Sequence, residues 1–135
     1  MKPVLGTIAL VAALCTAAAG AQQTTPRDEF FWLGEINKAT AVINTEQGLL
    51  DKSMAPRIAA GVAQVIREGN QPGGKRPRTV ITFEPLMIAA AGEDVTLLHA
   101  GRSSQDMHAT YRSAILRDDM LNLADQLNKT ARTLV

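Results

Sequence analysis

The sequence predicts an all-α fold, on three observations. Over residues 108–135, apolar residues recur every three or four positions, which is the period of an amphipathic helix. Hydrophobic residues make up 46% of the 135-residue chain but aromatic residues only 4%, so the core must be largely aliphatic. The one β-prone run, residues 79–83, is too short to form a sheet without a partner strand. We therefore expect packed helices joined by loops.

Residues 1–21 have the three parts of an export signal. Lys2 supplies the positive start, residues 4–19 form an apolar run, and Ala19-Gly20-Ala21 gives a small-x-small cleavage pattern. A retained membrane anchor is the alternative, disfavoured because the run is short and rich in Ala and Gly. We expect a secreted or periplasmic protein that leaves the membrane after signal removal. Its mature part has no thiol, because Cys15 is the single cysteine.

Two helices are expected next, over residues 28–44 and 49–68. The apolar face of the first would consist of Phe31, Trp32, Ile36, Ala39 and Ile43. Thr45-Glu46-Gln47 is typical of a new helix start, and Gly48 permits a bend there. Pro56 indicates a break or a fresh first turn.

The remaining elements are a loop, a linker and two helices, which a turn and a polar segment separate. Residues 69–78 are rich in Gly, Pro and basic side chains, which predicts a mobile, solvent-facing loop. We expect an extended linker over 79–83, a short helix over 84–91, a turn over 92–98 and a polar segment over 99–106. A long helix follows from His108, with its apolar stripe at Leu116, Met120, Leu123, Leu127, Ala131 and Leu134. The stripe continues to Val135 without a stop signal, so we expect part of its packing partner to lie outside this sequence.

Charge and motif patterns disfavour several functions. The chain has 14 Lys and Arg against 13 Asp and Glu, so no basic excess indicates a nucleic-acid partner. Residues 69–75 have the glycine and lysine spacing of a phosphate loop. However, Arg76 replaces the magnesium-binding hydroxyl, and Pro77 blocks the helix that should follow. His99 and His108 lack metal-ligand spacing, so we expect neither a metal nor another cofactor.

The polar segment is the strongest candidate site. Arg102 can hold a carboxylate with two hydrogen bonds, and Ser103, Ser104 and Gln105 can donate to it near a helix start that favours anions. Asp106 suits a helix cap better than an anion ligand. The alternative is a polar loop with a capping Asp, which composition alone does not exclude.

Residues 97–118, LLHAGRSSQDMHATYRSAILRD, resemble the first signature region of the fumarase/aspartase superfamily, and most closely the argininosuccinate lyase family. That family has a His-Thr-Gly-Arg-Ser-Arg-Asn-Asp-Gln run before a long bundle helix. His99, Arg102, Ser103 and Asp106 match it. Ser104 and Gln105 depart from it and are closer to the Ser-Gln-Asp run of adenylosuccinate lyases.

The resemblance implies a β-elimination that releases fumarate from a small dicarboxylate or amino-acid-derived substrate, in a homotetramer. After the signal peptide that the residues themselves indicate over 1–21, the resemblance implies an N-terminal helical lyase domain over 22–107, with the signature loop at its end, and the first part of a long central-bundle helix over 108–135. The substrate-binding residues it implies are Asn37, His99, Arg102, Ser103, Ser104, Gln105, Asp106 and Thr110.

The family's catalytic Ser loop and Thr-His region do not occur in the sequence, so the resemblance implies an N-terminal portion that is inactive alone. The alternative is a secreted, non-catalytic helical module that binds a small dicarboxylate.

Overall fold

The computed structural model describes residues 25–134, so the expected export signal over residues 1–21 lies outside the described part of the chain. Within residues 25–134 the structure is helical and has no strand, which confirms the all-α prediction. Its elements are α1 (Glu29–Glu46), α2 (Ala55–Gly69), α3 (Val80–Ala91), the 3-10 helix η1 (Glu93–His99) and α4 (Ser104–Thr133). None of these described helices is both long and apolar enough to span a bilayer.

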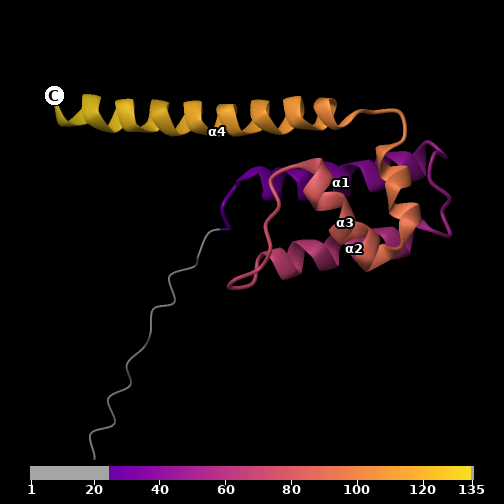
Figure 1. The fold of residues 1–135 in the computed structure, drawn as a ribbon. Coiled ribbons are helices and arrows are strands. Elements are labelled where there is room, and N and C mark those ends of the chain that lie inside the picture. The colour runs from indigo at the N-terminus through magenta and orange to yellow at the C-terminus, as the bar shows by residue number, and fades with distance from the viewer. Residues whose placement is uncertain (1–24, 135) are drawn as a thin grey trace, which may run out of the picture.

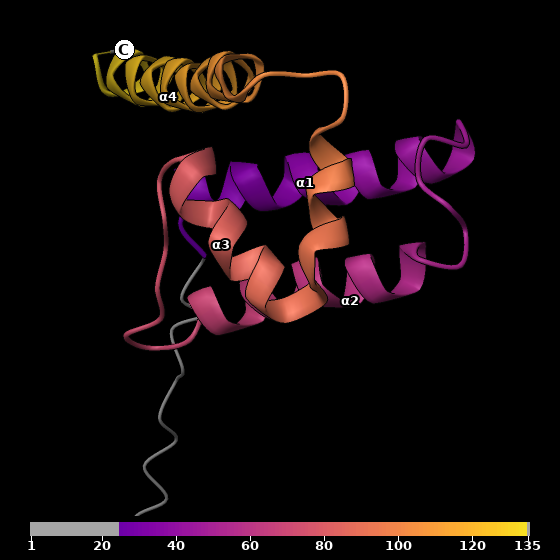
Figure 2. The same cartoon turned by 45° about the vertical axis from the view of Figure 1, so that its right-hand side comes forward.

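Three of the α-helices form a small body, and the fourth lies across its top. α1 and α2 lie side by side, and α3 crosses them (Figures 1 and 2). η1 returns the chain to α1, where a short loop leads into α4. The first half of α4 lies along α1, whereas its C-terminal half extends past the body (Figure 1).

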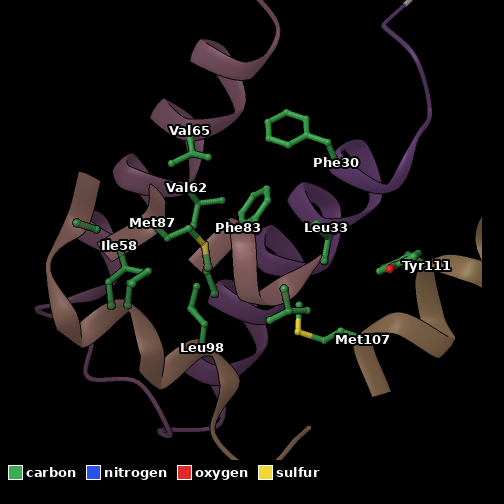
Figure 3. Close-up of a cluster of buried hydrophobic side chains, with 14 of the residues drawn as sticks. Phe30, Leu33, Ile58, Val62, Val65, Phe83, Met87, Leu98, Met107 and Tyr111 are labelled. Carbon is green, nitrogen blue, oxygen red and sulfur yellow. The ribbon is translucent and has the colours of Figure 1, made fainter. Parts of the chain in front are cut away.

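The core is aliphatic with two phenylalanines, as the composition predicts. Figure 3 shows side chains of α1, α2 and α3 converging, with Met107 and Tyr111 of α4 reaching the cluster at its edge. The rings of Phe30 and Phe83 pack at a tilt of 45°, with their centroids 5.4 Å apart. Gly61 allows α2 and α3 to approach closely, because a Cβ at this position would lie 2.5 Å from the Cβ of Ala91.

The predicted apolar face of α1 is wrong. Phe31, Trp32 and Ile36 are only partly buried, and Ala39 and Ile43 are exposed. The buried side chains of α1 are instead Phe30, Leu33, Asn37, Thr40, Ala41 and Asn44. Three of these are polar, and each finds a partner that removes the cost of burying it. Their hydrogen bonds run from Asn37 to Leu33 O, from Thr40 to Ile36 O and from Asn44 to Leu97 O.

Several predicted boundaries also shift. Residues Thr45–Gln47 end α1 rather than starting a helix, and Gly48 turns the chain with φ of 72°. The second helix begins at Ala55 rather than at residue 49, with Pro56 in its first turn, where the missing N–H costs nothing.

The segment predicted as an extended linker, residues 79–83, is the start of α3, because the Thr79 side chain caps the helix by accepting from Thr82 N. The last helix begins at Ser104 rather than at His108.

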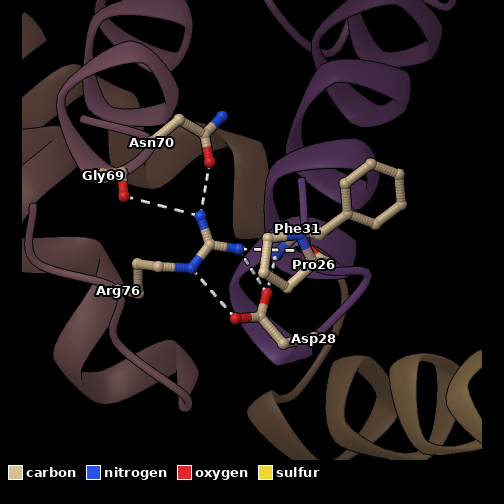
Figure 4. Close-up of polar contacts among 6 residues, drawn as sticks. All are labelled: Pro26, Asp28, Phe31, Gly69, Asn70 and Arg76. Carbon is tan, nitrogen blue, oxygen red and sulfur yellow. Dashed lines mark hydrogen bonds and ion pairs between the residues drawn. The ribbon is translucent and has the colours of Figure 1, made fainter. Parts of the chain in front are cut away.

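The loop between α2 and α3 is anchored rather than free. Its Arg76 donates to both carboxylate oxygens of Asp28, at 3.0 and 2.6 Å, and also to Asn70 and Gly69 at the end of α2 (Figure 4). The guanidinium also lies 4.5 Å from the centre of the Phe30 ring. Asp28 in turn caps α1 by accepting from Phe31 N. Arg76 therefore joins the loop to the start of α1 and to the end of α2.

Candidate functional site

A partly buried series of polar side chains links α1, α3 and η1. The Nε2 atom of His99 lies 3.1 Å from Asn37 Oδ1, and its Nδ1 atom lies 3.2 Å from Glu84 Oε1. Asn37 is fully buried at 0% exposure. Its Nδ2 donates to Leu33 O at 2.9 Å, which fixes its oxygen toward His99. Asn37 and His99, both predicted site residues, are thus in direct contact.

The groups around His99 have opposing effects on the protonation of its imidazole ring. Both ring nitrogens face oxygen acceptors, which a neutral imidazole with one hydrogen cannot satisfy together unless a proton is shared with Glu84. Burial lowers the pKa of His99, the Glu84 carboxylate opposes this shift, and the nearby Arg102 lowers the pKa further. Protonation of His99 therefore affects its contacts with both Glu84 and Asn37.

Within the described part of the chain, the guanidinium of Arg102 is hydrogen-bonded through only one of its three nitrogens. Its Nη1 donates to Thr40 Oγ1 at 2.7 Å, one helical turn along α1 from Asn37. Its Nε and Nη2 atoms are buried and have no hydrogen-bond partner among residues 25–134. Burial lowers the pKa of Arg102, an effect that the Asp106 carboxylate opposes. Since a guanidinium stays charged in proteins, two buried N–H groups of a cation are left unsatisfied.

The start of α4 is a capping box. Ser103 Oγ lies 2.9 Å from Asp106 Oδ2, which also accepts from Ser103 N at 2.8 Å, and Asp106 N donates back to Ser103 Oγ at 3.3 Å. These bonds lower the pKa of Asp106 below its ordinary value. Asp106 thus caps the helix, and the hydroxyl of Ser103 is engaged in the same box.

The other predicted residues lie on the first turns of α4. Ser104 is partly buried and Gln105 is exposed, and neither side chain has a hydrogen bond among the described residues. Thr110 Oγ1 donates to Asp106 O at 2.8 Å, within the helix. The predicted residues therefore form two groups, Asn37 with His99 and the start of α4, with Arg102 between them.

Two residues of this region were missed as site residues. Glu84 contacts His99, and Thr40 contacts Arg102. Glu84 is the one charged residue in the apolar sequence of α3, VITFEPLMIAAA, and that isolation is a signal that could have identified it. Thr40 carries no comparable signal, because a threonine in a helix is usually explained by a bond to its own backbone.

Among residues 25–134, no three His, Cys, Asp or Glu side chains gather where they could hold a metal ion. The ring of His108 packs against that of Tyr111, with their centroids 5.4 Å apart. In the glycine-rich loop, the guanidinium of Arg76 is bound to Asp28, so this loop does not surround an open anion site.

Comparison with known proteins gives a distant similarity to argininosuccinate lyases. The chain is 30% identical over 102 residues to the enzyme of Methanosarcina acetivorans, 29% to that of Methanosarcina mazei and 26% to that of Methanosarcina barkeri. The match covers 74% of this chain but only 21% of each relative, so the chain spans about a fifth of their length. No family model and no solved structure matches. The chain is therefore similar to a limited part of argininosuccinate lyases.

Proposed function

We propose that this chain is part of a lyase of the argininosuccinate lyase type, in which Arg102 binds a carboxylate of the small substrate. The similarity over 102 residues supports the lyase class. The observation that carries the binding role is the pair of unsatisfied nitrogens, Nε and Nη2, on Arg102. An orphaned buried cation edge is costly unless a ligand completes it.

The chemistry of that edge favours a carboxylate. The Nε–H and Nη2–H groups of a guanidinium are parallel and match the two oxygens of a carboxylate. Arg102 also immediately precedes α4, whose first backbone N–H groups lack helical partners and favour negative charge. Because both nitrogens are covered in this conformation, binding requires the Arg102 side chain to turn outward. Gly101, with φ of 78° and open space beside it, lies at the point where the loop would adjust.

Elimination needs a base and an acid. The family's regions that supply these groups, the Ser loop and the Thr-His region, have no counterpart in this sequence. We therefore expect the chain to bind fumarate or succinate and to release no fumarate from argininosuccinate. The same chemistry serves a non-catalytic dicarboxylate-binding module, and the two functions differ in their selectivity. A lyase part should prefer argininosuccinate, whereas a simple module should bind any small dicarboxylate equally.

Titration calorimetry tests the binding. Arg102→Lys keeps the charge but loses the two-pronged geometry, and we expect at least a tenfold loss of affinity for fumarate. Arg67→Lys, at an exposed arginine of α2, is the matched control and should bind as the parent does. A parent chain that binds no dicarboxylate would refute the carboxylate role. Fumarate formation from argininosuccinate, followed by absorbance, would refute the claim that the chain is inactive alone.

A further inference from the structure

An apolar groove lies between the C-terminal half of α1 and the N-terminal half of α2. Its volume is about 520 Å³, within the range of about 300–1,000 Å³ that is typical of small-molecule sites. The apolar side chains that line it are Ala41, Val42, Ala55, Ala59 and Val62. Val42 is 57% exposed, so the groove is open to solvent.

Two side chains of opposite charge line one end of this groove. α1 and α2 run antiparallel, so the end of α1 and the segment before α2 lie at the same end of the body (Figure 2). Glu46 from the first and Lys52 from the second both line the groove there. Neither forms an ion pair among residues 25–134. The third charged lining residue, Lys38, is paired with Glu35 at 2.6 Å.

The helix dipoles make both charges unfavourable for the chain on its own. A carboxylate is disfavoured at the C-terminus of a helix and a cation at the N-terminus. Glu46 is the last residue of α1, whose last turn has no basic residue. Lys52 lies just before α2, whose first turn has no acidic residue and whose N-cap, Met54, makes no side-chain hydrogen bond. The neighbouring Asp51 accepts from Ser53 and does not line the groove.

We propose that this groove binds a free aliphatic amino acid, such as leucine. Its ammonium lies beside Glu46, its carboxylate lies beside Lys52, and its side chain extends along the groove toward Ala59 and Val62. An α-amino acid carries both charges on one carbon, next to an apolar side chain, which matches two opposite charges at one end of an apolar surface. The ammonium and the carboxylate also have the signs that the ends of α1 and α2 favour.

The groove is separate from the Arg102 site. At about 100° per residue, Val42 and Thr45 of the groove lie roughly opposite Thr40 on α1. Thr40 is the residue that accepts from Arg102. The amino-acid site is therefore independent of the proposed lyase function, and binding at the two sites is distinguished by where the chain responds to each ligand.

Two-dimensional ¹H–¹⁵N NMR of the full chain, titrated with L-leucine, tests the site. Amide signals of residues 38–46 and 52–62 should shift and saturate. No shift, or shifts confined to residues 99–106 around Arg102, would overturn the proposal. Three analogues each lack one part of leucine: 4-methylpentanoate the ammonium, 3-methylbutylamine the carboxylate and glycine the apolar side chain. Each should bind roughly five- to tenfold more weakly, and an analogue that binds as tightly as leucine would overturn the role of the part it lacks.

Substitutions in the groove test the same contacts from the side of the protein. Glu46→Gln and Lys52→Gln should each weaken leucine binding roughly fivefold, and Ala59→Leu should abolish it by filling the groove. Because both charges oppose the helix dipoles, their removal should not lower the urea midpoint of unfolding, so unfolding would not explain the lost binding. Glu93→Gln and Lys75→Gln, at exposed charges elsewhere, are the matched controls and should bind as the parent does. Equal weakening in the controls, or full binding in Ala59→Leu, would overturn the proposal.

Discussion

Replacing Arg76 by Ala should destabilise the protein by about 2–3 kcal/mol. The side chain gives Asp28 two hydrogen bonds, and bonds with charged groups are worth about 1.5–3 kcal/mol each before solvent screening. Arg76 and Asp28 are 21% and 33% exposed, so we reduce this contribution toward the value of a surface pair. Stacking on Phe30 adds about 0.5–1 kcal/mol.

Arg78 provides the control for this prediction. It pairs with Glu29 at 2.6 Å, the same distance as the Arg76–Asp28 pair, but its side chain is 76% exposed. Arg78→Ala should therefore leave stability unchanged within error, since solvent screens the pair. Urea unfolding of both variants gives the two free energies of unfolding. Equal losses would refute the argument that burial, rather than distance, sets the strength of these pairs.

Three other changes have defined outcomes. Gly61→Ala should cost about 1–3 kcal/mol in urea unfolding, because its methyl would lie 2.5 Å from the Ala91 Cβ; a stabilised variant would contradict the close approach of α2 and α3. Tyr111→Phe removes a buried hydroxyl that donates to a loop carbonyl at 3.2 Å and should lower the free energy of unfolding by about 1 kcal/mol. Burial lowers the pKa of His99 despite Glu84, so the unfolded chain binds the proton more tightly and stability should fall as the pH drops below about 6.5. His99→Gln should show a smaller loss between pH 7.5 and 5.5, and an identical loss would contradict this assignment.

Helix positions could be predicted from the sequence more accurately than the buried face of α1. The apolar period located the helices, but it assigned Ile43 to the core and did not select Asn37 or Asn44. Periodicity counts only apolar residues, whereas α1 buries amides that find partners in Leu33 O, Leu97 O and His99. Leu97 and His99 are more than 50 residues away in the sequence, so no local pattern reveals these two partners.

The same limit explains the errors at the start of α3. Residues 79–83 are β-branched or aromatic and favour an extended chain in isolation. The side-chain cap from Thr79 and the burial of Val80 and Phe83 against the other helices outweigh that preference. The capping role of Asp106, by contrast, was predictable because the Ser103 partner lies three residues away in sequence.

The buried edge of Arg102 and the exposed apolar face of α4 are unsatisfied features of different kinds. The first lacks a hydrogen-bond acceptor among the described residues, whereas the second lacks apolar contact with them. Arg102→Lys should therefore weaken dicarboxylate binding, whereas Leu123→Asp, at a position of α4 that is 59% exposed, should leave dicarboxylate binding unchanged. Weaker binding in both variants would show that the outer face of α4 is coupled to the Arg102 site, which directly precedes the first turn of this helix.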